Sequence, residues 1–189
     1  MSDKRDIQEL LSNRPSKETV YLTMAFVIAQ RSFDPSSKCG CLIVSKDDRI
    51  LSAGYNGPIK GSDDTKIPLE RPYKYYHMLH SEENALLAYN GSYQDIIGAT
   101  AYVTGKPCHK CFRMMIQKGI TKIVYGTNHT KVLDQDDYNA QKLMLEYGVK
   151  VDIKELDSND DVILLLNGTN GYIEEKNKAH KNYEEKENV

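Results

Sequence analysis

Apolar residues in the first third of the chain form one helix-like segment followed by two short runs. Residues 16–32 begin with a serine suited to capping a helix and contain apolar side chains throughout, which predicts a first helix. Residues 39–45 and 49–55 are short and largely apolar, and the polar turn Lys46-Asp47-Asp48 separates them. This arrangement predicts a β-hairpin.

Helical and strand patterns alternate in the second half. The predicted helices cover residues 79–89, 108–118 and 135–147, and the predicted strands cover 99–104, 122–125 and 149–153. Strands that alternate with helices of about 10 to 13 residues are typical of crossover units. The pattern therefore predicts an α/β fold whose sheet is mostly parallel and begins with an antiparallel hairpin.

The segment between the hairpin and the next helix has no obvious element. It spans residues 56–72 and contains two glycines and three prolines. A loop of this length is unusual in a compact domain and favours a functional role. We expect an N-terminal arm over residues 1–15, one domain over 16–154 and an acidic, partly disordered extension over 155–189.

The charge balance narrows the possible partners. The 189 residues include 25 Lys and Arg and 27 Asp and Glu, a net charge of −2. The last segment, residues 155–189, has nine acidic and four basic side chains, so the remainder is mildly cationic. Near-neutrality argues against binding nucleic acid through bulk charge. No apolar run is long enough to span a membrane and no signal segment opens the chain, so we expect a soluble protein of the cytoplasm.

The four cysteines are too few for a disulfide scaffold and form two close pairs. The second pair lies in Pro107-Cys108-His109-Lys110-Cys111, and a second motif, His80-Ser81-Glu82, also lies at the start of a predicted helix. One imidazole and two thiolates give three ligands for tetrahedral Zn²⁺ and leave a fourth position for water. Glu82 would lie beside the metal and transfer protons.

Together these two motifs are the signature of zinc-dependent nucleobase deaminases. The alternative is a structural zinc site, which normally needs a fourth protein ligand. The residues that would have to complete it are His77, His109, Cys39 or Cys41. The two motifs in this order, each at a helix start, favour catalysis.

Further segments resemble the deoxycytidylate (dCMP) deaminase family over about residues 19–153. They are Arg31-Ser32-Phe33-Asp34-Pro35, Gly54-Tyr55-Asn56-Gly57, Lys74-Tyr75-Tyr76-His77-Met78-Leu79 and Tyr102-Val103-Thr104. The resemblance implies a three-layer α/β/α cytidine deaminase-like fold with a mixed five-stranded sheet. It also implies zinc-dependent hydrolysis of dCMP to dUMP and ammonia, which supplies thymidylate synthesis.

The same resemblance implies roles for individual residues. His80, Cys108 and Cys111 would bind Zn²⁺ and Glu82 would be catalytic. The substrate-binding residues would be Asn56, Ser36, Lys38, Thr104 and His129. Asn56 would contact the sugar or else act only as a turn residue, and the Ser36-Ser37-Lys38 loop would bind the phosphate or else be ordinary surface. Lys106 stands where the family commonly has an apolar residue, and would attract phosphate or be solvated.

Regulation is also implied by the resemblance. Such enzymes form homohexamers, are activated by dCTP, are inhibited by dTTP and use Mg²⁺ with the effector. The effector-binding residues would be Gly57, Pro58, Lys60 and Gly61. Asp63 and Asp64 would either help to hold Mg²⁺ or form a solvated acidic turn.

Three questions stay open at the level of sequence. Cys39 and Cys41 point to one face of a strand, so they are either a second zinc site or buried small side chains, which we favour. The protein could deaminate a base within RNA or single-stranded DNA, although no basic stripe supports this. It could also be a catalytically silent nucleotide-sensing zinc module, although the intact Glu82 argues against that reading.

Overall fold

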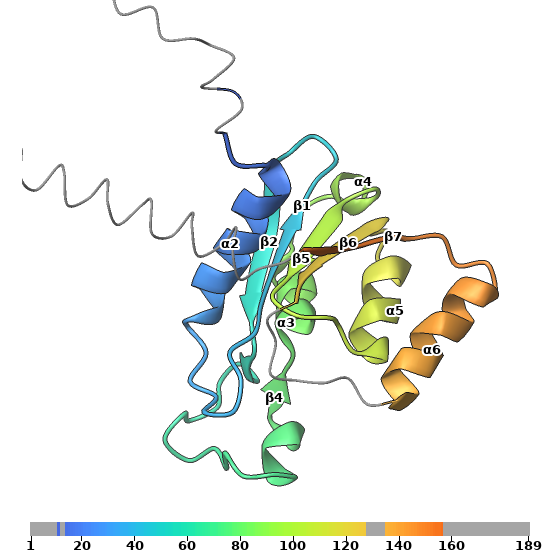
Figure 1. Cartoon of the computed structure of the whole chain (residues 1–189). Helices are drawn as coiled ribbons and strands as arrows, with labels where there is room; N and C mark the ends of the chain where they lie inside the picture. The colour runs from blue at the N-terminus through green and yellow to red at the C-terminus, as the bar shows by residue number, and fades with distance from the viewer. Residues whose placement is uncertain (1–10, 12–13, 128–134, 157–189) are drawn as a thin grey trace, which may run out of the picture.

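The computed structural model describes residues 11, 14–127 and 135–156 (Figure 1). The strands are β1 (Gly40–Val44), β2 (Ile50–Tyr55), β3 (Gly57–Pro58), β4 (Met78–Leu79), β5 (Thr100–Val103), β6 (Lys122–Gly126) and β7 (Asp152–Leu156). The α-helices are α2 (Lys17–Ala29), α3 (Ser81–Ala88), α4 (Tyr93–Ile96), α5 (His109–Gln117) and α6 (Gln135–Glu146), and η1 (Tyr73–Tyr76) is a 3₁₀ helix. No helix within these ranges is both long and apolar enough to cross a membrane.

Five strands form a mixed sheet in the order β2-β1-β5-β6-β7. Strand β1 is antiparallel to both β2 and β5, whereas β5, β6 and β7 are parallel to one another. The mixed five-stranded sheet with an antiparallel first hairpin is confirmed. The sheet is mostly parallel in strand direction, as expected, because β2, β5, β6 and β7 run the same way and β1 alone runs opposite to them. Since β1 lies between β2 and β5, two of the four pairings are nevertheless antiparallel.

Helices cover both faces of this sheet, as the three-layer prediction requires (Figure 1). On one face, Leu22 and Ala25 of α2 pack against Leu42 and Val44 of β1. On the other face, α3 and α5 contribute Ala85, Phe112 and Met115, which pack against the neighbouring β1 residues Cys41 and Ile43. Strand β1 is therefore buried on both sides, which explains its uninterrupted apolar sequence.

The segment between β2 and α3 is more structured than expected. Strand β3 starts directly after Asn56 and pairs with β4, with Gly57 opposite Leu79 and Pro58 opposite Met78. The 3₁₀ helix η1 lies between them in sequence. Because β4 includes Leu79 and His80 caps the next helix, α3 begins at Ser81 and not at the predicted residue 79.

Three further elements differ from the sequence prediction. Helix α2 ends at Ala29 and not near residue 32, and the short helix α4 was not expected. The last strand begins at Asp152 and continues to Leu156, because its register is set by pairing with β6. It therefore crosses the boundary expected at residue 154.

Candidate metal centre and active site

Three metal-binding side chains meet where two helices begin. His80 is the N-cap of α3, Cys108 is the N-cap of α5, and Cys111 lies in the first turn of α5. The His80 Nδ1 atom is 3.5 Å from the Cys108 Sγ and 3.4 Å from the Cys111 Sγ. Zinc bonds of about 2.1 Å to nitrogen and 2.3 Å to sulfur, at tetrahedral angles, place nitrogen and sulfur about 3.6 Å apart. The three donors therefore fit a zinc ion.

The donor group contains no fourth protein ligand among residues 14–127 and 135–156. His77, His109, Cys39 and Cys41, which would have to complete a structural site, are not members of it. Cys41 is fully buried in the apolar core and Cys39 lines a cavity, and no second group of three or more metal-binding side chains includes either of them in that part of the chain. A site with three protein ligands leaves one position open, as catalytic zinc sites do.

A close approach of backbones sets the position of His80. A Cβ atom built at Gly54 of β2 would lie 2.3 Å from the Ala85 nitrogen and 2.4 Å from the Ser81 oxygen. Glycine is therefore required there for β2 to pack against the first turn of α3. The His80 backbone N–H is held as well, because it donates to the Glu83 carboxylate at 2.8 Å.

The two thiols affect each other's titration. A hydrogen bond from Cys111 holds the pKa of the Cys108 thiol well below its ordinary value. The same bond, together with burial, raises the pKa of Cys111. Without a cation the pair thus favours a single negative charge, whereas a bound metal ion takes both sulfurs as thiolates.

Glu82 is a buried carboxyl group beside the metal donors. Its side chain lies in the wall of the same cavity as His80 and Cys108, and it accepts a hydrogen bond of 2.9 Å from the Ser81 hydroxyl. Burial raises its pKa above the ordinary value of a glutamate, and the nearby His80 only partly opposes this. A carboxyl group with a raised pKa is suited to both accepting and donating a proton near neutral pH.

The cavity brings together some of the expected substrate-binding residues but not all of them. Asn56 and Thr104 line it, whereas Ser36 and Lys38 are exposed and do not; the residue between them, Ser37, does. His129 lies outside the described residues. The full lining comprises Asp34, Ser37, Cys39, Asn56, Arg71, Lys74, Tyr75, Met78, Leu79, His80, Ser81, Glu82, Val103, Thr104, Gly105, Lys106 and Cys108.

Asn56 and Thr104 both tie neighbouring backbone segments together. The Asn56 side-chain oxygen accepts a hydrogen bond of 2.7 Å from the Cys39 N–H, and its amide donates to the Ser37 carbonyl at 3.0 Å. The Thr104 hydroxyl accepts a hydrogen bond of 3.1 Å from the Gly40 N–H. Asn56 therefore fixes the loop before β1, and because a side-chain amide has two N–H groups, one more can serve a ligand.

The expected effector residues lie apart from this cavity lining. Gly57 and Pro58 form β3, and the exposed Lys60 and Gly61 follow it. Asp63 is exposed and pairs with Lys66, and a hydrogen bond from the Thr65 side chain is the main cause that lowers its pKa. No group of metal-binding side chains includes Asp63 or Asp64 within the described ranges.

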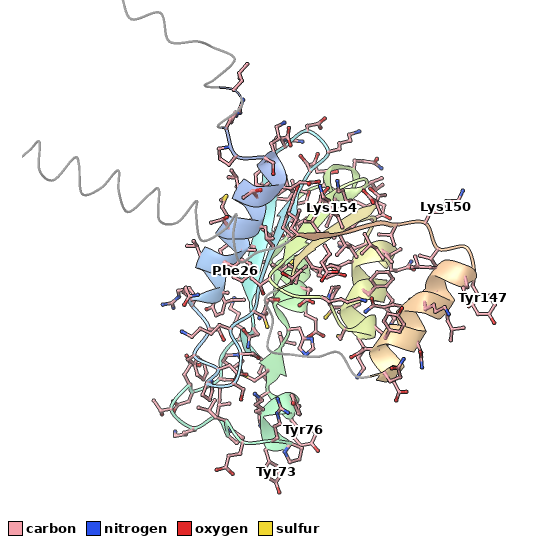
Figure 2. The ribbon with its side chains drawn as sticks, viewed as in Figure 1. Phe26, Tyr73, Tyr76, Tyr147, Lys150 and Lys154 are labelled. Carbon is pink, nitrogen blue, oxygen red and sulfur yellow. The ribbon has the colours of Figure 1, made fainter. Side chains whose placement is uncertain are left out.

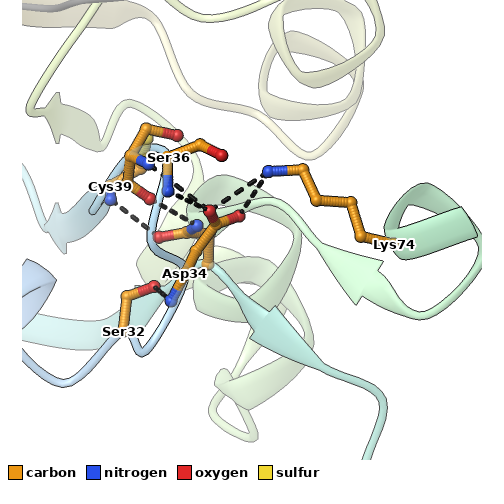
Figure 3. A network of polar contacts seen from close by, with 7 residues as sticks. Ser32, Asp34, Ser36, Cys39 and Lys74 are labelled. Atoms are coloured by element: carbon orange, nitrogen blue, oxygen red, sulfur yellow. Dashed lines mark hydrogen bonds and ion pairs between the residues drawn. The ribbon is translucent and has the colours of Figure 1, made fainter. Parts of the chain in front are cut away.

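Two polar arrangements in the structure were not expected from the sequence. The first is a buried ion pair between Asp34 and Lys74 in the cavity wall (Figure 3). Both residues belong to segments that resemble the dCMP deaminase family, and this resemblance was the signal by which the sequence could have pointed to them. Their separation of 40 positions in the chain gave no indication that they pair.

The second arrangement connects α6 to the loop that carries Cys108. One Asp137 oxygen accepts a 2.8 Å hydrogen bond from the His109 backbone N–H and lies 2.5 Å from the His109 Nδ1. Gln141 donates to the Pro107 carbonyl at 2.7 Å. Both α6 side chains are buried. They hold the residues on either side of Cys108.

Comparisons with known proteins agree with this geometry. Residues 15–127 match the family model described as the cytidine and deoxycytidylate deaminase zinc-binding region. Deoxycytidylate deaminase of Homo sapiens is 34% identical over 130 residues, which cover 66% of this chain and 71% of the relative. The corresponding protein of Pongo abelii is 33% identical over 132 residues, which cover 67% of this chain and 72% of the relative.

A solved structure gives the same result at the level of the fold. The crystal structure of the dCMP deaminase from the cyanophage S-TIM5, in apo form, is similar with a TM-score of 0.55 and 25% sequence identity. The match covers 76% of this chain and 99% of that one. Since the family model spans more than half of the sequence and the donors fit zinc, the chain belongs to the cytidine and deoxycytidylate deaminase family and is a hydrolytic deaminase.

Proposed function

We propose that the protein hydrolyses dCMP to dUMP and ammonia and so supplies thymidylate synthesis. The observation that carries this proposal is the meeting of His80, Cys108 and Cys111 with the buried Glu82 in one cavity. The relatives that are about a third identical to the chain are deoxycytidylate deaminases, which supports the choice of substrate.

The residues of the chain divide the work as follows. His80, Cys108 and Cys111 would hold Zn²⁺, which when bound lowers the pKa of a coordinated water to about 7. Glu82 takes a proton from the attacking water and delivers it to the ring nitrogen next to the amino-bearing carbon. It then passes the second water proton to the departing amino group, so that a carbon–oxygen bond replaces the carbon–nitrogen bond and ammonia leaves.

The charges in the cavity wall suit an anionic substrate. Arg71 and Lys106 both line the cavity, and neither pairs with a carboxylate among residues 14–127 and 135–156. Lys106 lies over the Tyr138 ring, with its Nζ 4.9 Å from the ring centre. We infer that these two cations attract the phosphate of dCMP. Ser36 and Lys38, which flank the lining residue Ser37, would contribute from outside the wall.

Asn56 and Thr104 remain our proposed contacts to the nucleoside part of the substrate. Both are buried, both line the cavity, and both come from segments next to β1. His129 stays a proposed substrate contact on the basis of its sequence position alone, and its imidazole would stack on the base or donate a hydrogen bond to the phosphate.

We propose that dCTP activates the enzyme, that dTTP inhibits it, and that Mg²⁺ accompanies the effector on residues Gly57, Pro58, Lys60 and Gly61. The pairing of β3 with β4 supports this proposal, because β4 ends at the residue before His80. The Ile59 N–H also donates to the His77 carbonyl at 2.9 Å. An effector that moves this loop would therefore pull on the segment that leads into the zinc site.

A homohexamer in solution is part of the same proposal. Three tyrosines of η1 expose large apolar rings, and Figure 2 shows Tyr73 and Tyr76 projecting outwards from the molecule. Tyr76 leaves 74% of its surface exposed. Exposed aromatic side chains gathered on one element are suited to contacts between subunits.

One set of assays tests the proposed reaction. Zinc-loaded protein is given dCMP, deoxycytidine or a single-stranded cytosine-containing oligonucleotide, and ammonia release is measured with and without dCTP or dTTP and Mg²⁺. We expect dCMP to be the preferred substrate. Turnover of the oligonucleotide but not of dCMP would establish the nucleic-acid reading, and zinc-loaded protein inert on all three would establish the silent module.

Metal analysis tests the proposed ligands in the same preparation. Cys108→Ala should lose stoichiometric zinc, whereas the matched variant Cys39→Ala should keep it, because Cys39 lies outside the donor group. Zinc retained by both variants would contradict the ligand assignment. The mass in solution gives the oligomeric state.

A further inference from the structure

The cavity wall contains a buried carboxylate whose charge is balanced by one lysine. The Lys74 Nζ lies 3.1 Å from the Asp34 Oδ1 and 3.0 Å from the Asp34 Oδ2 (Figure 3). The two side chains are only 4% and 6% exposed. Both residues line the cavity that contains Glu82. This ion pair is shielded from solvent. Water therefore screens its charges only weakly, and any net charge on the pair would attract or repel a charged ligand in the cavity.

Asp34 has a structural task that requires an oxygen acceptor at this place. Its Oδ1 accepts hydrogen bonds from the backbone N–H groups of Ser36, at 2.8 Å, and Ser37, at 3.4 Å. The Ser37 carbonyl in turn accepts from Asn56. The Asp34 side chain therefore shapes the loop that forms one side of the cavity.

Because Asp34 holds this loop with a carboxylate, it leaves a negative charge in the wall of the cavity. Burial alone would raise the pKa of Asp34, but the hydrogen bonds from Ser36 and Lys74 hold it below the ordinary value. The carboxyl group is thus ionised at neutral pH. A nucleoside monophosphate carries about two negative charges at that pH, so an unbalanced carboxylate would repel it.

Lys74 is placed to neutralise the charge of Asp34. Within the described part of the chain its ammonium pairs with no carboxylate except Asp34. The Nζ lies 5.7 Å from the centre of the Tyr75 ring, which also lines the cavity. Arg71 packs on the same ring at 5.8 Å and has no carboxylate partner in that part of the chain. With Asp34 neutralised, the wall presents a net positive charge.

We propose that Lys74 is a specificity-determining positioning residue, which neutralises Asp34 so that the cavity accepts a nucleoside monophosphate. This inference rests on the proposed function. It assigns to Lys74 no contact with the reacting atoms and no proton transfer. A purely structural ion pair would affect charged and neutral substrates alike, whereas the proposed role affects the charged substrate selectively.

The test uses three variants and two substrates of different charge. The variants are Lys74→Met, Asp34→Asn and the double variant, and kcat and KM are measured for dCMP and for the neutral nucleoside deoxycytidine. Lys74→Met should raise the KM for dCMP relative to that for deoxycytidine by about tenfold or more, because Asp34 becomes unbalanced. Asparagine keeps the oxygen that Ser36 and Ser37 need, so the double variant should return the ratio to within about threefold of the wild type.

Asp34→Asn alone should change the ratio of the two KM values in the opposite direction. This variant keeps the proposal testable even if Lys74→Met does not fold. It leaves Lys74 unbalanced, so it should lower the KM for dCMP relative to that for deoxycytidine. Calorimetric binding of dUMP and of deoxyuridine repeats the comparison without turnover, and circular dichroism checks the fold.

Equal changes for the charged and the neutral ligand in every variant would overturn the inference, as would a double variant that behaves like Lys74→Met. Failure of the proposed function looks different. In that case the zinc-loaded wild-type protein itself neither deaminates dCMP nor binds dUMP better than deoxyuridine.

Discussion

Replacing Asp137 should weaken zinc binding although this residue is not a member of the group of metal donors. One Asp137 oxygen accepts from the backbone N–H of His109, the first residue of α5, and also contacts the His109 ring. His109 directly follows Cys108, which is a proposed zinc ligand. In Asp137→Ala the loop that carries Cys108 loses this anchor, while the apolar packing of α5 on the sheet is kept.

The magnitude follows from what is left unpaired. A buried donor without a partner costs about 1 to 3 kcal/mol, and a negative charge lost from a helix N-terminus costs about 0.3 to 1 kcal/mol. The Asp137 side chain is only 10% exposed, so solvent replaces little of this. We expect the free energy of unfolding to fall by about 1.3 to 4 kcal/mol. Loss of a residue that supports a metal ligand commonly costs about 10- to 100-fold in metal affinity.

The assay separates these two effects with a neighbouring control. Asp136 lies in the same first turn of α6 but is exposed, so Asp136→Ala should change neither quantity by much. Zinc affinity is measured by competition with a chromogenic chelator, and stability by urea denaturation of the zinc-free protein. If Asp137→Ala and Asp136→Ala bind zinc equally well, the reasoning about α6 is refuted.

Three further changes test other parts of the structure. Glu82→Gln should keep stoichiometric zinc but lose turnover by about 10²-fold or more, and retained activity would remove Glu82 from the mechanism. Gly54→Ala should lower the free energy of unfolding by about 1 to 3 kcal/mol through overlap with α3. The control Gly57→Ala should cost less, because the nearest atom to the new Cβ would be a carbon of the Tyr55 ring at 3.3 Å. For Asp34 the native pKa lies below that of the unfolded chain, so its stabilisation is complete above about pH 4 and is lost as the pH falls through the native value. The difference in stability between wild type and Asp34→Asn, measured by denaturation of the zinc-free protein, should therefore shrink from pH 7 to pH 3.

The cluster of candidate metal donors was predictable because its information is local. His80 and Glu82 lie two positions apart, and Cys108 and Cys111 three apart, each pair at the start of one helix. The alternation of strands and helices likewise appears in short windows. The periodicity of the chain sufficed for the layers and for most elements.

What the sequence did not reveal depends on pairing between distant segments. Asp34 with Lys74 and Asp137 with His109 are separated by 40 and 28 positions, so their contacts exist only once the sheet has brought the segments together. The last strand is a similar case. Val149 and Val151 made residues 149–153 look like the strand, but hydrogen bonding to β6 starts at Asp152. The apolar pattern indicates which residues are shielded from solvent, whereas the bounds of β7 are set by which of its residues pair with β6.

The short ladder between β3 and β4 makes the intervening segment a separable part of the enzyme. Its two rungs join Gly57 to Leu79 and Pro58 to Met78, so residues 59–77 leave the body of the fold and return at a fixed point next to His80 (Figure 1). Because the two rungs separate this excursion from His80, we expect changes of length or sequence within residues 59–77 to be accommodated on the far side of the rungs. Because Arg71, Lys74 and Tyr75 belong to it and line the cavity, substrate preference can diverge in evolution, or be redesigned by segment exchange, while the hydrolytic centre stays in place.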